Sequence, residues 1–148
     1  MIDVEVSVGG ELSIAPELER IEAAVRWALG EEGVGEAEMS IALLDDAGIA
    51  ALNAEYLEHA GPTDVISFAL HGEGEAPLGD VYLGVEQAVR QAAGFGATPA
   101  EELLRLAIHG TLHVLGYDHP KDAARAGSEM FERQEALLKS FLASEAAG

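Results

Sequence analysis

Three histidines in the second half of the chain have a type and spacing suited to metal chemistry. His109 and His113 lie four residues apart, and His119 follows six residues later. Residues 103–115 leave almost no polar face, which predicts a buried helix. Two imidazoles four residues apart project from one side of a helix, with a rise of about 6 Å, and can converge on an ion at about 2.1 Å.

The residues after this helix predict a third ligand. Gly116 can adopt the left-handed conformation that ends a helix, and the turn at Tyr117 and Asp118 would bring His119 back toward the pair. The alternative is a set of core histidines bonded to carbonyls, but each unpaired buried polar group costs roughly 1–3 kcal/mol, whereas one ion satisfies three acceptors. The sequence therefore predicts one zinc ion per chain on these three histidines.

Three ligands leave a coordination position open for water, which is typical of catalytic rather than structural zinc. The chain has no cysteine, so thiolate ligands and disulfides are excluded. His59 and His71 are alternative fourth ligands, although both lie in polar, loop-like segments. The spacing is similar to that of zinc peptidases, but these have a glutamate base directly after the first histidine, where this chain has Gly110.

Several polar side chains are candidates for the remaining roles. Asp80 is the candidate for handling the proton of the water, and Asp118 the candidate for orienting a histidine through its second nitrogen. Asp64 has a simpler interpretation as a strand-end acceptor of backbone hydrogen bonds, and Ser67 as strand packing. We therefore expect Asp80 and Asp118 to be the catalytic residues.

The elements that must position these residues follow from hydrophobic periodicity. Alternation predicts strands over 2–8 and 37–43, and β-rich runs predict two more around 65–68 and 81–83. Helices are expected from Pro16, after Asp45 with an apolar face of Ile49, Leu52 and Tyr56, and over about 86–93. Two further helices begin at a Thr98–Glu101 capping box and at about residue 123. This order predicts an α+β domain, residues 1–148, with a mixed sheet layered with helices.

The composition narrows the function classes. A net charge of −19 disfavours a stand-alone nucleic-acid binder, because the average field repels phosphates. No apolar run approaches the roughly 18 residues that a bilayer requires, so we expect neither a membrane span nor a signal peptide. A cytoplasmic location fits this composition.

The segment His109-Gly-Thr-Leu-His113-Val-Leu-Gly-Tyr-Asp-His119 resembles the signature of the YbeY family of endoribonucleases. The segments 52–56, 62–68 and 78–81 extend the resemblance. It implies a zincin-like α+β fold with about four strands and five helices, and zinc on the three histidines. It further implies cleavage of single-stranded RNA in ribosomal RNA 3′-end maturation and ribosome quality control, with precursor ribosomal RNA and the ribosome or its proteins as partners.

One position departs from the family pattern. The family usually has arginine after the tyrosine of its Leu-Asn motif, whereas Leu57 follows Tyr56 here. Leucine cannot pair with a phosphate, so either a substrate contact is missing or Leu57 extends the apolar face of its helix into the core. Two alternatives stay open: a metal-dependent amide or ester hydrolase, and a non-catalytic ribosome-assembly factor with structural zinc.

Overall fold

The computed structural model describes residues 1–117 and 123–147, and over 123–128 the backbone only. This part of the chain contains four strands, five α-helices and one short 3-10 helix, which confirms the predicted α+β class. The elements are β1 (Ile2–Gly9), α1 (Leu18–Glu31), β2 (Ala37–Leu44), α2 (Asp46–Leu57), β3 (Val65–Ala69), β4 (Leu78–Gly84), α3 (Val85–Ala92), η1 (Ala93–Phe95), α4 (Pro99–Val114) and α5 (Ala123–Ala147).

The four strands form one mixed sheet in the order β1-β2-β4-β3. β1, β2 and β4 are parallel neighbours, and β3 pairs antiparallel with β4 at the edge. The register pairs Ser67 with Val81 and Phe68 with Asp80. Because successive side chains of a strand point to opposite faces, Ser67 and Val81 share one face of the sheet, and Phe68 and Asp80 share the other.

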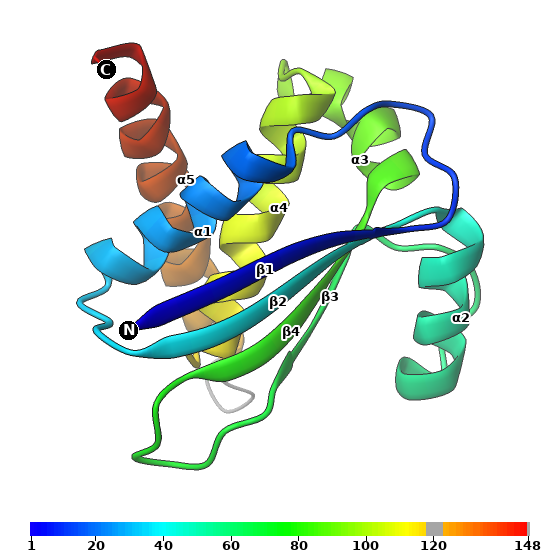
Figure 1. Ribbon diagram of the computed structural model, residues 1–148. Coiled ribbons are helices and arrows are strands. Elements are labelled where there is room, and N and C mark those ends of the chain that lie inside the picture. The colour runs from blue at the N-terminus through cyan, green and yellow to red at the C-terminus, as the bar shows by residue number, and fades with distance from the viewer. Residues whose placement is uncertain (118–122, 148) are drawn as a thin grey trace.

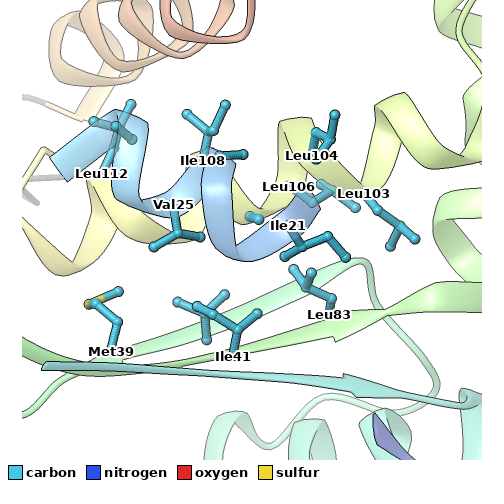
Figure 2. Packing of buried hydrophobic residues seen from close by; sticks show 14 of the residues in the cluster. Ile21, Val25, Met39, Ile41, Leu83, Leu103, Leu104, Leu106, Ile108 and Leu112 are labelled. Atoms are coloured by element: carbon cyan, nitrogen blue, oxygen red, sulfur yellow. The ribbon is translucent and has the colours of Figure 1, made fainter. Parts of the chain in front are cut away.

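Helices cover one face of this sheet and bury the main core there. Figure 1 shows α1 and α4 lying across the sheet, with α5 against them and α2 on the opposite side. Figure 2 shows Val25 of α1 directed toward Met39 and Ile41 of β2, and Leu104, Ile108 and Leu112 of α4 in a row on the side away from these strand residues. The side chains of Val25, Ile41 and Ile108 are fully buried. This packing holds α4, with its two histidines, directly over the sheet.

The starts of α2 and α4 follow the predicted caps, whereas α1 begins at Leu18, two residues after the predicted Pro16. Asp45 accepts a hydrogen bond from the Gly48 amide at 2.9 Å and caps α2. At the start of α4, the Thr98 hydroxyl accepts from the Glu101 amide at 3.1 Å, and the Glu101 carboxylate accepts from the Thr98 amide at 3.0 Å. The capping box is therefore confirmed. No helix in the described part of the chain is both long and apolar enough to cross a bilayer.

The predicted apolar face of α2 is wrong beyond its first turns. Its buried residues are Ile49 and Asn53, whereas Tyr56 is 57% exposed and Leu57 is 43% exposed. The Asn53 side chain is satisfied by donating to the Gly61 carbonyl at 3.0 Å. Figure 1 shows α2 projecting beyond the sheet, so little protein is left to cover its last turn. Leu57 therefore does not extend a stripe into the core.

Candidate metal centre

His109 and His113 lie on the last turns of α4, and both are partly buried. After this helix the Gly116 amide donates to the His113 carbonyl at 3.0 Å, and the Tyr117 amide donates to the Leu112 carbonyl at 3.2 Å. Gly116 has φ +97°, the left-handed conformation predicted for the helix end. The chain thus turns sharply at Gly116, three residues after the second histidine.

The ring of His109 is held from α5. Its Nδ1 lies 2.7 Å from Oε1 of Gln134, whose own amide nitrogen donates to Glu135 at 3.0 Å. That second contact fixes the amide with its oxygen toward the imidazole, so Nδ1 carries the proton and donates it. In the neutral ring, Nε2 then bears the lone pair that a metal requires.

The ring of His113 is held from the sheet. Its Nδ1 lies 2.7 Å from Oγ of Ser67, on the face of β3 that α4 covers. Such a contact at Nδ1 is the arrangement that orients a metal-binding imidazole to coordinate through Nε2. The two histidine rings are therefore held by hydrogen bonds from two different elements, His109 from α5 and His113 from the edge strand β3.

This donor set fits zinc in chemistry, because two neutral imidazoles on one helix, each held at Nδ1, supply two of the nitrogen ligands that zinc prefers. The predicted third ligand His119 and the predicted catalytic Asp118 lie outside the described residues. Within the described residues, no group of three or more His, Cys, Asp or Glu side chains could hold a metal ion. His59 and His71 accordingly do not complete the pair, and His71 instead accepts from the Leu78 amide at 3.1 Å.

Gly110 shows why a peptidase base is absent. A Cβ atom at this position would lie 2.5 Å from Cγ1 of Val81 on β4. A glutamate there would therefore be driven into the sheet rather than toward a metal-bound substrate. The sequence difference that weakens the peptidase interpretation has a packing cause: α4 approaches β4 too closely for any side chain.

Asp80 lies away from the histidine pair. It is paired with Phe68 across β3 and β4, whereas the adjacent Val81 is fully buried beneath α4. Asp80 therefore faces the side of the sheet opposite to α4. There it approaches Tyr82, whose phenol pKa is raised by burial and by the neighbouring carboxylate. The structure does not bring Asp80 to the predicted metal site.

A pocket of about 340 Å³ adjoins His109. Its wall includes Asp64 just before β3, Glu102 and Arg105 of α4, and Gln134 of α5. Glu102 is only 1% exposed and accepts from Arg105 at 2.6 Å. The sequence interpretation of Asp64 as a strand-end acceptor is incomplete, because its carboxylate accepts from the Gln91 side chain at 3.2 Å on the pocket wall.

Sequence reasoning missed the two side chains that hold the histidines. Ser67 stands within the recognisable segment 62–68, but only the position of α4 distinguishes its covered face from the open one. Gln134 carries no local signal, since it reaches His109 from a helix that begins after the histidine segment. Both contacts depend on how separate elements pack.

Known proteins resemble this chain over nearly its whole length. A family model described as Endoribonuclease YbeY matches residues 11–142. The endoribonuclease YbeY of Moorella thermoacetica is 44% identical over 143 residues, which cover 88% of this chain and 87% of that protein. The corresponding protein of Geobacillus thermodenitrificans is 38% identical over 139 residues, covering 86% and 88%.

A solved structure supports the same fold. The solution structure of TM1509 from Thermotoga maritima matches with a TM-score of 0.69 and 25% sequence identity, covering 97% of this chain and 92% of that one. The extent of the family match and the identity to the curated relatives confirm the resemblance that the histidine segment indicated. The chain belongs to the YbeY family of endoribonucleases, hydrolases that cleave phosphodiester bonds.

Proposed function

We propose that this chain is a zinc-dependent endoribonuclease specific for single-stranded RNA, which acts in the cytoplasm in ribosomal RNA 3′-end maturation and ribosome quality control. One zinc ion per chain would be held by His109, His113 and His119. The observation that supports this most is the histidine pair of α4, with each ring bonded at Nδ1 to Gln134 or Ser67. Asp118, next to His119 in sequence, is proposed to orient a ligand.

The chemistry that zinc supplies when bound is a lowered pKa for water, toward about 7, and stabilisation of charge on a phosphoryl oxygen. The protein residues hold the two imidazole rings in a fixed orientation. Oε1 of Gln134 accepts a hydrogen bond from Nδ1–H of His109, which selects the tautomer with a free lone pair at Nε2. Ser67 bonds to Nδ1 of His113 and sets the direction of that ring. Asp80 receives no role at the metal in this proposal.

The charge distribution supports a partner-guided encounter with RNA. Five arginine side chains in the described part of the chain each pair with a carboxylate: Arg20, Arg26, Arg90, Arg105 and Arg133. Paired arginines release few counterions from phosphates, and the net charge of −19 opposes binding. We infer that the chain binds naked RNA weakly. It would dock instead on a basic protein surface of the ribosome, with precursor ribosomal RNA as the substrate.

The direct test compares cleavage of one end-labelled RNA as a single strand and as a duplex by the zinc-loaded protein. We expect cleavage of the single strand only, loss of cleavage on chelation, and recovery when zinc is returned. His113→Ala is the matched inactive control, and a peptide and an ester substrate should stay intact. A fully zinc-loaded protein that cleaves no RNA would favour the non-catalytic assembly factor, and cleavage that survives chelation would refute the zinc mechanism.

A further inference from the structure

The pocket beside His109 has two exposed aromatic side chains in its wall. Phe95 of η1 and Phe131 of α5 are each 53% exposed, although both are apolar and both line the pocket. A large apolar side chain left half in solvent at the mouth of a pocket gains most from a flat ligand that covers it. Nucleobases are such ligands, since every base presents a face that stacks on an aromatic ring.

The charged groups of this pocket are unsuited to phosphate. Arg105 donates to Glu102 at 2.6 Å and to Glu135 at 2.8 Å, so two carboxylates neutralise its guanidinium. Its carbon Cζ also lies 5.0 Å from the centre of the Phe95 ring. With Asp64 on the same wall, the pocket region carries more negative than positive charge. A neutral base fits this surface, and a phosphate does not.

The hydrogen-bonding groups on the wall are mainly acceptors. The Gln91 amide nitrogen is already engaged, donating to Asp64 at 3.2 Å and to Glu102 at 2.6 Å. Both oxygens of Glu102 have partners, whereas Oδ1 of Asp64 has only a long 3.5 Å contact from the Thr63 hydroxyl. Asp64 therefore retains acceptor capacity for an incoming N–H group. Adenine, cytosine and guanine offer an exocyclic amino group with two N–H donors, whereas uracil offers a single N3–H between two carbonyl oxygens, which a carboxylate repels.

We propose that this pocket binds one nucleobase of the RNA, stacked on Phe95 or Phe131, and that Asp64 favours a base with an exocyclic amino group over uracil. The inference rests on the proposed function, because it assigns the pocket to the same substrate. It makes base contacts, rather than phosphate contacts, the source of RNA affinity in this acidic protein. Because His109 lies in the pocket wall, a nucleotide stacked there would bring the neighbouring phosphodiester of the RNA close to the His109–His113 pair.

The test measures binding separately from cleavage. Zinc-loaded protein is titrated into fluorescein-labelled short 2′-O-methyl oligonucleotides of adenine, cytosine or uracil, and anisotropy gives the Kd. We expect adenine and cytosine strands to bind roughly tenfold more tightly than uracil strands. Phe131→Ala or Phe95→Ala, whichever removes the ring that the base stacks on, should weaken adenine-strand binding roughly tenfold. Asp64→Asn, whose amide can also donate, should bring the uracil and adenine affinities together.

Matched controls separate recognition from folding. Val8→Ala removes an exposed apolar side chain from β1, the opposite edge of the sheet, and should leave every Kd unchanged. Zinc content and Tm should match wild type in both phenylalanine variants, because their side chains are half in solvent. Unchanged adenine-strand binding in both variants would overturn the stacking site, and an unchanged base preference in Asp64→Asn would overturn the selection by Asp64.

Parallel cleavage assays on the matching RNA strands distinguish this inference from the proposed function. We expect the phenylalanine variants to raise KM more than they lower kcat. Base-dependent binding without any cleavage would support the nucleobase pocket and contradict the nuclease proposal. Cleavage with KM unmoved by either phenylalanine substitution would mean that the nuclease proposal stands and the pocket assignment fails.

Discussion

The two faces of the sheet differ in what they do with polar residues. On the face that α4 covers, the Ser67 hydroxyl forms a hydrogen bond with the ring of His113, among buried aliphatic side chains. On the other face, Phe68 and Tyr82 pack edge to face, with ring centres 6.1 Å apart, beside Asp80. Ser67 and Phe68 are adjacent in sequence, yet one contacts a histidine and the other packs on an aromatic ring, because a strand alternates its side chains between faces. The position of α4 decides which face acquires the site.

The close approach of α4 to the sheet predicts the largest stability effect. Gly110→Ala would place a Cβ atom 2.5 Å from Cγ1 of Val81, so α4 or β4 must shift. We expect a loss of about 1–3 kcal/mol in unfolding free energy, measured by urea denaturation. Gly30→Ala is the control, because nothing lies within 4 Å of its added atom in α1. Equal effects of the two substitutions would show that α4 does not pack as closely as described.

The hydrogen bonds that hold the two histidine rings predict the next largest effect, a change in zinc affinity. Ser67→Ala and Gln134→Ala each remove the hydrogen-bonding partner of one Nδ1, at 2.7 Å in both cases, while leaving the imidazoles in place. Loss of such a partner should weaken zinc affinity by roughly 10- to 100-fold. Competition with a metal-sensitive chelator measures this change. Wild-type affinity in both variants would mean that neither contact orients a ligand.

Leu57→Arg tests the departure from the family pattern. Because Leu57 is 43% exposed, the substitution should change the unfolding free energy by no more than about 0.5 kcal/mol. If the position contacts the RNA backbone, the new guanidinium should raise kcat/KM for RNA about tenfold, as one charge-assisted hydrogen bond does. Leu57→Gln controls for polarity without charge. A stable arginine variant with no gain would reject phosphate capture at this position.

Asp80→Asn should have the smallest effect on the site, because Asp80 lies on the face away from α4. Zinc content and RNA cleavage should stay at the wild-type level. Burial and then the Asp80 carboxylate raise the pKa of Tyr82, so removing the charge should lower that pKa, which an ultraviolet titration against Tyr82→Phe detects. Loss of zinc in Asp80→Asn would return this residue to the metal site.

Local sequence patterns were enough to predict the secondary-structure elements and to place the histidine pair on one helix. Alternation along residues 2–8, the capping box at Thr98 and the four-residue histidine spacing all act within one element, and the structure confirms each of these elements. The prediction for Asp80 used residue type and position at a strand end, without knowing which face a helix would cover. Ser67 and Gln134 required that knowledge as well, since their contacts span 46 and 25 residues. Such contacts follow from tertiary packing, which no local pattern encodes.

Zinc analysis of the purified protein tests whether the α4 face holds a zinc ion through its histidine pair. Wild type and His113→Ala are expressed and purified identically, and zinc and protein are quantified in the same samples. We expect about one zinc ion per wild-type chain and almost none in the variant, because no third His, Cys, Asp or Glu among the described residues joins the pair to replace a lost imidazole nitrogen. An unchanged zinc ratio in His113→Ala would contradict a zinc site at this pair.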